Sequence, residues 1–389
     1  MRDVTVVGAS LAGLATVRAL RAQGFTGTIT VVGDEKHLPY DRPPLSKEFL
    51  AGSSDEDAIA LTEDDDAALG VDWRLGRTAL ALDGPTRTVT LDDGSTLSAD
   101  AVVLATGARA RNLPGELPGG VHTLRTLDDA RALRADLVPG RRLVVIGAGF
   151  VGAEVASTAH GLGLEVTIVE AAPVPLQRAL GPEMGAACGR LHAAAGVPLL
   201  LGAGVARLVG SPRVTGVELT DGRELPADVV VVGIGALPNV EWLEGSGVEL
   251  DDGVVTDAEG RTNLPGIVAV GDCASAHRAY TGNRLRLEHW TNALQQPAVA
   301  AAALLGAEHS LPAHHAVPYF WSDQYGHNIQ FAGHRDADGT VRIDDGDPEG
   351  DGGFLAVFLD AEGEAVGVLG VDRPRPFGRM RRELAKRIR

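Results

Sequence analysis

The sequence predicts an α/β protein with two parallel-sheet units and a smaller α+β unit at its C-terminal end. The main observation is an internal repeat, because residues 4–13 read VTVVGASLAG and residues 143–152 read LVVIGAGFVG. Each copy is a short β-branched run that ends at a glycine and continues into an Ala-rich stretch typical of a helix. A second observation is that three further apolar runs, typical of buried parallel strands, end at a glycine: residues 102–107, 229–235 and 267–271.

Length and composition agree with a globular protein of two or three domains. The chain has 389 residues, of which 44% are hydrophobic and 22% are charged, so packed cores are expected and wholesale disorder is not. The formal net charge of −17 disfavours nucleic acid and anionic membranes as partners. The sequence shows no apolar run typical of a spanning helix and no signal-peptide pattern, so we expect a cytoplasmic protein.

The chain has two cysteines, Cys188 and Cys273, which do not form a CxxC pair or a Cys/His metal pattern. This spacing disfavours a disulfide scaffold, a zinc domain and a protein-held iron–sulfur cluster. Cys188 lies in an Ala-rich helical run and is expected to be a core thiol. Cys273 directly follows Asp272 and is expected to be buried, with no redox role.

The glycine spacing of each copy is that of a dinucleotide-binding turn. The first glycine forms the tight turn, the second lets the backbone approach a pyrophosphate, and the third lets the helix pack on the strand. The later copy has all three, at Gly147, Gly149 and Gly152. The earlier copy has Gly8 and Gly13 but carries Ser10 at the middle position. A serine still permits close approach and can itself donate a hydrogen bond to a phosphate.

An acidic residue follows each copy where the next strand is expected to end. These residues are Asp34 after the first copy and Glu170 after the second. A carboxylate at this place accepts hydrogen bonds from the hydroxyls of an adenosine ribose. Glycine turns in a protein that binds nothing would explain neither acid, so the two motifs together predict two nucleotide sites.

With these motifs the chain resembles the two-dinucleotide flavoprotein reductases of the glutathione reductase structural class. Three strings narrow the resemblance: PYDRPPLSK at residues 39–47, HTLRTLDDA at residues 122–130, and FWSDQ at residues 320–324. They are similar to strings of the FAD-dependent pyridine nucleotide ferredoxin reductases, of the putidaredoxin reductase and aromatic-ring dioxygenase type. The resemblance spans essentially the whole chain and is weakest in the last strands and the tail.

The resemblance implies a nested order of Rossmann-like domains. An FAD-binding domain would occupy residues 1–107 and 235–311, an NAD(H)-binding domain would be inserted at residues 108–234, and an α+β domain would follow at residues 312–389. Within the last part, residues 353–359 and 365–371 flank a turn and predict a hairpin. Residues 339–352 are acidic and Gly-rich, and we expect an exposed loop there.

The resemblance also implies which residues would bind FAD. The pyrophosphate and ribose side would be contacted by Gly8, Ser10, Ala12, Gly13, Asp34, Arg42 and Arg125. Lys47 would reach toward flavin N5, Asp272 would hydrogen-bond the ribityl chain, and Trp290 would lie over the pyrimidine edge. Ala79 would contact the adenine through its backbone.

A second set of residues would bind the nicotinamide nucleotide. Gly147, Gly149 and Gly152 would cradle its pyrophosphate, and Gly235 would let the nicotinamide approach. Glu170 would hold the ribose diol, and because its carboxylate repels the 2′-phosphate of NADP, we expect NADH rather than NADPH. Glu154 would point at the nicotinamide and pair with Lys47. The alternatives are that Glu154 only complements a helix dipole and that Lys47 is a solvated surface cation.

The implied activity is that of an NADH:ferredoxin oxidoreductase. A hydride would pass from NADH to FAD, and single electrons would then pass to an iron–sulfur ferredoxin that serves an oxygenase or a cytochrome P450. The PPLSK segment has no thiol where the disulfide reductases carry redox-active cysteines, so a one-electron carrier is the expected exit. Trp321 would be a ring exposed near the flavin, whereas Phe320 is expected to belong to the core.

Several alternatives stay open at this point. The chain is also compatible with a rubredoxin reductase, or with an interaction protein of the apoptosis-inducing-factor kind that binds FAD and NADH. Residues 373–389 carry eight cations against one acid. This tail is either a docking patch for an acidic ferredoxin, or a basic helix that neutralises the acidic body, or a mobile end. The protein is expected to be a monomer or a homodimer.

Overall fold

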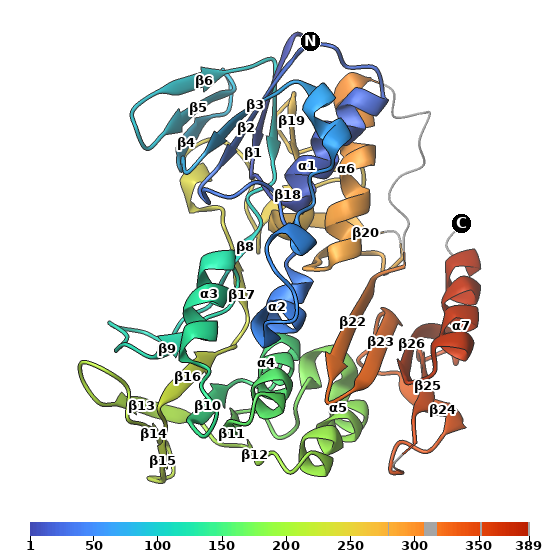
Figure 1. The fold of residues 1–389 in the computed structure, drawn as a ribbon. Helices are drawn as coiled ribbons and strands as arrows, with labels where there is room; N and C mark the ends of the chain where they lie inside the picture. Colours follow the sequence, from blue (N-terminus) through green and yellow to red (C-terminus); the bar gives the residue numbers. More distant parts are fainter. Residues whose placement is uncertain (279, 307–316, 351, 388–389) are drawn as a thin grey trace.

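The computed structural model describes residues 1–278, 280–306, 317–350 and 352–387. Figure 1 shows two lobes built around parallel sheets and a third part that carries the C-terminal strands and helix. The predicted α/β class is confirmed, with a parallel five-stranded sheet in each lobe and an antiparallel sheet in the third part. No helix among the described residues is long and apolar enough to cross a bilayer.

The first lobe is built on a sheet with the strand order β19-β7-β1-β2-β3. Its strands are β1 (Asp3–Val7), β2 (Thr28–Gly33), β3 (Val71–Leu75), β7 (Ala101–Leu104) and β19 (Ile267–Ala269). One face packs against helices α1 (Leu11–Ala22) and α6 (Trp290–Leu305). The other face packs against the small antiparallel sheet of β4 (Ala79–Asp83), β5 (Thr88–Leu91) and β6 (Thr96–Ser98). Covering on both faces explains why β1 and β7 are apolar without alternation.

The second lobe repeats this plan with the strand order β12-β11-β10-β16-β9. Its strands are β9 (Val121–His122), β10 (Arg142–Ile146), β11 (Glu165–Glu170), β12 (Leu199–Leu201) and β16 (Val229–Val232). The helices are α3 (Leu127–Asp136), α4 (Phe150–Gly161) and α5 (Gln177–Ala194), and a small sheet contains β13 (Val205–Val209), β14 (Gly216–Leu219) and β15 (Glu224–Pro226). The central strands β1 and β10 are the two copies of the sequence repeat.

The chain passes between the lobes through an antiparallel pair, β8 (Ala108–Ala110) and β17 (Ala236–Pro238). This pair directly follows the domain boundaries expected at residues 107 and 235. The first lobe is completed by β18 (Val254–Thr256), β20 (Ala274–Arg278) and β21 (Asn283–Arg286). The short helix α2 (Glu48–Ala51) packs instead against α3 and α4 of the second lobe, where Phe49 and Leu50 join the core. The boundary expected at residues 311–312 lies outside the described residues.

The C-terminal part is an antiparallel sheet with the order β22-β23-β26-β25-β24. Its elements are β22 (Tyr319–Gln324), β23 (His327–Gly333), β24 (Thr340–Gly346), β25 (Phe354–Leu359), β26 (Ala365–Val371) and α7 (Pro374–Arg387). Helix α7 buries Phe377 and Leu384 against this sheet.

The hairpin expected in the C-terminal part is confirmed, because β25 and β26 pair antiparallel. The exposed loop expected at residues 339–352 is wrong over its first half, where β24 pairs with β25. Strand β24 lies at the sheet edge, and its Asp and Arg side chains face solvent while Val341 and Ile343 are half-buried. The strand was not expected because its sequence is mostly polar and acidic, as is common in edge strands, and only two apolar residues alternate.

Candidate active site

Both glycine turns open into one cleft with a volume of about 1200 Å³. The predicted residues that line it are Gly8, Ser10, Ala12, Asp34, Arg42, Lys47, Arg125, Gly147, Gly149, Glu154, Glu170, Gly235, Asp272, Trp290 and Trp321. These residues come from all three parts of the chain, and the folding of the two lobes and the C-terminal sheet brings them together. Gly13, Gly152 and Ala79 are not among the lining residues.

The glycines of the two turns divide into two kinds. Gly8 (φ +125°) and Gly147 (φ +103°) form the tight turns, where an added Cβ would lie 2.0 Å and 2.3 Å from a backbone carbonyl oxygen. At Gly13 and Gly152 an added Cβ would lie 1.9 Å and 2.1 Å from the carbonyl oxygen of the first glycine. The third glycine therefore packs the helix onto the turn, as its place in the motif predicts, and does not face the cleft.

The middle position of each turn begins a helix that points its N-terminus into the cleft. Ser10 is the N-cap of α1, and Gly149 is the N-cap of α4. At Gly149 the nearest protein atom would lie 3.9 Å from an added Cβ, so this position borders open space. Free backbone N–H groups and the positive end of the helix dipole at both turns fit the two pyrophosphates of FAD and NADH.

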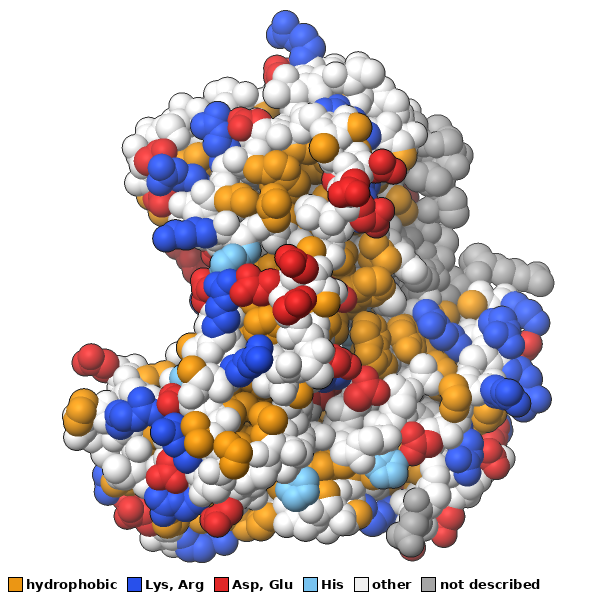
Figure 2. Space-filling view, in the orientation of Figure 1, with side chains coloured by type: hydrophobic (Ala, Val, Ile, Leu, Met, Phe, Trp, Pro, Cys, Tyr) orange, Lys and Arg blue, Asp and Glu red, His pale blue; other side chains and the backbone are white. Residues whose placement is uncertain are grey.

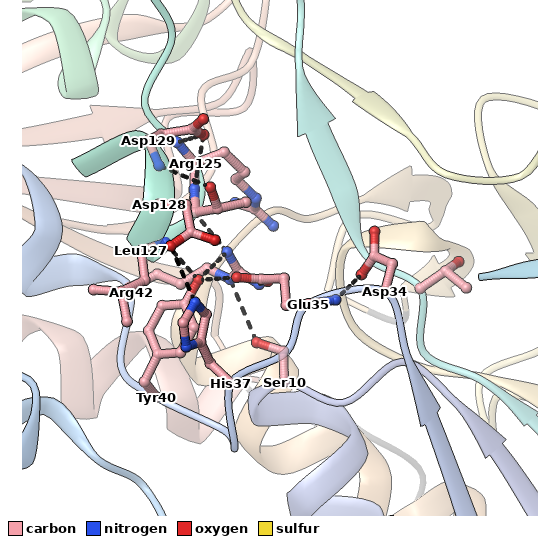
Figure 3. Close-up of polar contacts among 12 residues, drawn as sticks. Ser10, Asp34, Glu35, His37, Tyr40, Arg42, Arg125, Leu127, Asp128 and Asp129 are labelled. Carbon is pink, nitrogen blue, oxygen red and sulfur yellow. Dashed lines mark hydrogen bonds and ion pairs between the residues drawn. The ribbon is translucent and has the colours of Figure 1, made fainter. Parts of the chain in front are cut away.

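Arg42 is fixed at the edge of the first turn by a hydrogen-bond network (Figure 3). Its guanidinium donates to Glu35 Oε1 at 2.6 Å and to the Arg125 carbonyl at 2.6 Å, and its Nε lies 3.4 Å from Ser10 Oγ. Tyr40 also donates its hydroxyl to Glu35, and burial raises the pKa of Tyr40, which keeps this hydroxyl protonated. The network presents a cation beside the first glycine turn.

The two acids at the end of β2 take different places. Glu35 faces Arg42, whereas the Asp34 carboxylate lies apart from that network and accepts from the Glu35 backbone N–H at 3.0 Å (Figure 3). Asp34 is exposed at the cleft, so its carboxylate oxygens are accessible to a ribose diol. The sequence pattern points to Asp34 alone, and nothing in it marks the adjacent Glu35 as the partner of Arg42.

Arg125 and Asp272 bind each other at 2.7 Å across the cleft wall. Arg125 precedes α3, whose N-cap Thr126 accepts a hydrogen bond from the Asp129 N–H. Asp272 lies in the turn that follows β19. Both residues were expected at the FAD site, and the structure joins them in an ion pair that lines the cleft.

A series of aromatic rings leads from the cleft toward α7. The Trp290 indole donates to Asp41 Oδ1 at 2.7 Å, and its ring lies edge-on to Trp321 at 6.2 Å. Trp321 stacks on Tyr319 at 5.9 Å, and the guanidinium of Arg381 in α7 lies 4.0 Å above the Tyr319 ring. Burial raises the pKa of Asp41. No pattern in the sequence identifies Asp41 as the hydrogen-bond partner of the Trp290 indole.

Lys47 and Glu154 form a buried ion pair with 2.7 Å between Lys47 Nζ and Glu154 Oε2. Lys47 also donates to the Pro43 carbonyl at 3.1 Å, so its interpretation as a solvated surface cation is wrong. The Glu154 side chain accepts two further hydrogen bonds, from Ser46 at 2.5 Å and from Ser322 at 2.7 Å. Its position is therefore set by three side chains and not by the helix dipole alone.

Glu170 is held at the end of β11 by its own neighbourhood. Its two carboxylate oxygens accept from the backbone N–H groups of Ala148 and Ala172, each at 2.8 Å. The Ala148 bond joins the carboxylate to the second glycine turn. Gly235, with φ +108°, has no heavy atom within 4 Å of an added Cβ, so it borders open space.

The structure also bears on the expectations for Ala79, Phe320 and the basic tail. Ala79 begins β4 and is not a cleft residue, because the small sheet packs on the far face of the first lobe. Phe320 was expected in the core, and it does pack half-buried against the core of the C-terminal sheet, with Phe150 at 4.4 Å and Phe331 at 5.2 Å, but it also lines the cleft. Arg389 and the Arg387 side chain of the basic tail lie outside the described residues.

The two cysteines are free and buried, and neither lines the cleft. Burial raises the pKa of Cys188 to about 12 and also raises the pKa of Cys273. Because the thiolate is the reactive form of cysteine, neither side chain is suited to carry electrons out of this cleft.

Known proteins share this architecture and sequence. The family described as "Pyridine nucleotide-disulphide oxidoreductase" matches residues 2–297, and the family "Reductase C-terminal" matches residues 319–389. The ferredoxin reductase component of chlorobenzene dioxygenase from Cupriavidus sp. (strain PS12) is 43% identical over 376 residues, which cover 96% of this chain and 90% of that protein. Putidaredoxin reductase from Pseudomonas putida is 39% identical over 341 residues, covering 85% of this chain and 80% of that protein.

Comparison with solved structures leads to the same family as the sequence matches. The crystal structure of the covalent putidaredoxin reductase–putidaredoxin complex superposes with a TM-score of 0.94 and 35% identity, covering 99% of this chain and 93% of that chain. The expected family is thus confirmed across both lobes and the C-terminal part. The chain belongs to the pyridine nucleotide-disulphide oxidoreductase family, among its ferredoxin reductases.

Proposed function

We propose that this chain is an NADH:ferredoxin oxidoreductase that holds FAD at the first glycine turn and NADH at the second. The observation that carries the proposal is the cleft of about 1200 Å³, which both turns share and which neither buried cysteine lines. Its relatives are named as ferredoxin reductase components of dioxygenase systems and as putidaredoxin reductase. We propose the same class of acceptor here, a ferredoxin that serves an oxygenase or a cytochrome P450.

When bound, FAD supplies the redox chemistry, because it takes a hydride from NADH and gives up electrons singly. The chain supplies binding and orientation. Arg42, Ser10 and the N-terminus of α1 would neutralise the FAD pyrophosphate, and Asp34 would accept from its ribose. The Lys47–Glu154 pair, 2.7 Å long and nearly dry, would fix one cation and one carboxylate beside the reacting rings.

The second site would favour NADH through Glu170. Its carboxylate is fixed by two backbone N–H groups, so it cannot turn away from a nucleotide that carries a 2′-phosphate. A ribose diol donates hydrogen bonds to such a group, whereas the dianionic phosphate of NADPH meets repulsion.

The acceptor would dock where the aromatic series reaches α7. Figure 2 shows Lys and Arg side chains gathered over α7, beside a hydrophobic area over β22. The exposed members on α7 are Arg375, Arg379, Arg382 and Lys386. On a chain of net charge −17, this local patch would steer an acidic ferredoxin toward Tyr319 and Trp321.

A cytoplasmic location is part of the proposal. Both cysteines are free, which fits a reducing compartment that also contains NADH.

The experiment is a partner panel. The reconstituted holoenzyme is mixed with NADH and cytochrome c, and a ferredoxin or a rubredoxin is added. We expect cytochrome c reduction that depends on the ferredoxin and saturates with it. Cytochrome c reduction with rubredoxin but not with ferredoxin would contradict the proposal and indicate a rubredoxin reductase. Slow flavin reduction with a long-lived charge-transfer band and no turnover would favour the interaction protein.

A further inference from the structure

We propose that Ser322, in the C-terminal part, is a positioning residue that fixes the Glu154 carboxylate for recognition of the nicotinamide half of NADH. The inference rests on the proposed function, which places NADH at the second turn. Ser322 is fully buried, and its Oγ lies 2.7 Å from Glu154 Oε1. It follows Trp321 in β22 and faces α4 of the second lobe.

The direction of the hydrogen bond follows from the neighbour of Ser322. Gln324, which is 1% exposed, donates its side-chain N–H to Ser322 Oγ at 3.0 Å. A hydroxyl has one proton to give. Because the oxygen of Ser322 already accepts from the amide, its proton is directed to the carboxylate of Glu154.

The other carboxylate oxygen is bound by the N-terminal segment that precedes α2. Glu154 Oε2 accepts from Ser46 at 2.5 Å and lies 2.7 Å from Lys47 Nζ. The two oxygens of one carboxylate are therefore fixed by two different parts of the chain, one by the N-terminal segment of residues 46–47 and one by the C-terminal sheet. If Ser322 is truncated, Oε1 loses this donor and the carboxylate is no longer held against rotation.

Strand geometry connects this contact with the proposed electron exit. Successive side chains of a strand point to opposite faces. Trp321 lines the cleft against Trp290, whereas Ser322 points to Glu154. Two neighbouring residues of β22 therefore serve the two proposed functions. Ser322 binds Glu154, the carboxylate proposed to face the nicotinamide, and Trp321 is the ring at the proposed electron exit.

The test is Ser322→Ala in the FAD-loaded full-length enzyme, with binding of NAD⁺ and of ADP-ribose measured by calorimetry. ADP-ribose lacks the nicotinamide, so it reports on the rest of the site. We expect the Kd for NAD⁺ to rise about tenfold, as for loss of one fixed hydrogen-bonding group, and the Kd for ADP-ribose to stay within about twofold. The long-wavelength charge-transfer absorbance with NAD⁺ after flavin reduction should weaken in parallel.

The matched control is Ser157→Ala. Ser157 lies on the same helix α4, and its Oγ accepts from the Tyr325 N–H at 2.7 Å, at the end of the same strand. This variant removes one hydroxyl from the same interface and should leave both Kd values within about twofold. Equal weakening of NAD⁺ by both variants, or equal weakening of NAD⁺ and ADP-ribose by Ser322→Ala, would show a structural role and overturn the proposal.

Two outcomes separate this inference from the proposed function. Unchanged NAD⁺ binding by Ser322→Ala contradicts only the role of Ser322. A wild-type holoenzyme that retains FAD but does not bind NAD⁺ contradicts the proposed function, and with it the basis of the inference.

Discussion

The two glycine turns share one backbone plan but differ in what surrounds them. The first turn faces charged side chains from distant segments, including Arg42 with Glu35 and Arg125 with Asp272. The second turn is bordered by its own loop, and Glu170 is bound by the backbone of Ala148 and Ala172. A glycine turn enclosed by charged side chains of several segments suits a cofactor that stays, and a turn whose acid is held by local backbone suits a nucleotide that exchanges.

The largest effect is expected when the tight turn of one copy is blocked. Gly8→Ala places a Cβ 2.0 Å from the Ala105 oxygen at φ +125°, which costs about 3 kcal/mol or more of stability through overpacking and strain. We expect a colourless, poorly stable protein. Gly147→Ala meets Gly233 at 2.3 Å, and we expect it to keep the flavin and lose NADH. Flavin absorbance and NADH titration measure both, and loss of the same ligand in both variants would contradict the assignment of the two turns.

The next effect concerns the acids of the two copies. Glu170→Gln removes the charge that disfavours a 2′-phosphate, so the ratio of kcat/KM for NADH over NADPH should fall about tenfold, or ~1.4 kcal/mol. The matched variant Asp34→Asn should weaken FAD retention and leave that ratio unchanged. Steady-state kinetics with both nucleotides decide, and a shift in the ratio by Asp34→Asn would remove the distinction between the copies.

Local features of the two turns could be predicted from the sequence, whereas contacts between distant segments could not. Turn glycines, buried strands and terminal acids are local patterns, and the structure contains them where the sequence predicts strands and turns. Partners such as Asp41 for Trp290 and Ser322 for Glu154 lie 249 and 168 positions apart. They depend on how three parts of the chain pack together, which no periodicity encodes. Glu35 was missed because Asp34 alone satisfied the expected pattern.

A moderate effect is expected from pH at the contact of the second lobe with the C-terminal part. Burial lowers the pKa of His192 from 6.5 to about 4, and its Nδ1 lies 2.8 Å from the Tyr325 hydroxyl. Between these two values the unfolded chain binds the extra proton, so stability is full above about pH 6.5 and falls as pH falls toward 4, by up to roughly 3 kcal/mol.

The variant His192→Gln should reduce the loss of the thermal midpoint between pH 7 and pH 4.5, values chosen to bracket the titration. The exposed His277 provides the control, and His277→Gln should leave the pH dependence unchanged. An unaltered slope in His192→Gln would show that this contact does not sense acid.

The smallest effect is expected at the basic patch of α7. Arg379→Glu should raise the KM for ferredoxin about threefold at low salt, and the difference should vanish at high salt because exposed charges are screened. Arg223→Glu makes the same charge change on the turn between β14 and β15, away from the patch, and should not alter the KM. Equal effects of the two variants would indicate net charge and not docking.

In the proposed function, electrons enter from NADH at the second glycine turn and leave singly from the FAD that the first turn holds. The most direct measurement is an anaerobic titration of the holoenzyme with NADH, followed at the flavin absorbance of about 450 nm, with oxidised ferredoxin added afterwards. We expect NADH to bleach the band and ferredoxin to restore it. A protein with no such band after reconstitution with FAD, or a bleached band that ferredoxin leaves unchanged, would contradict the proposed function.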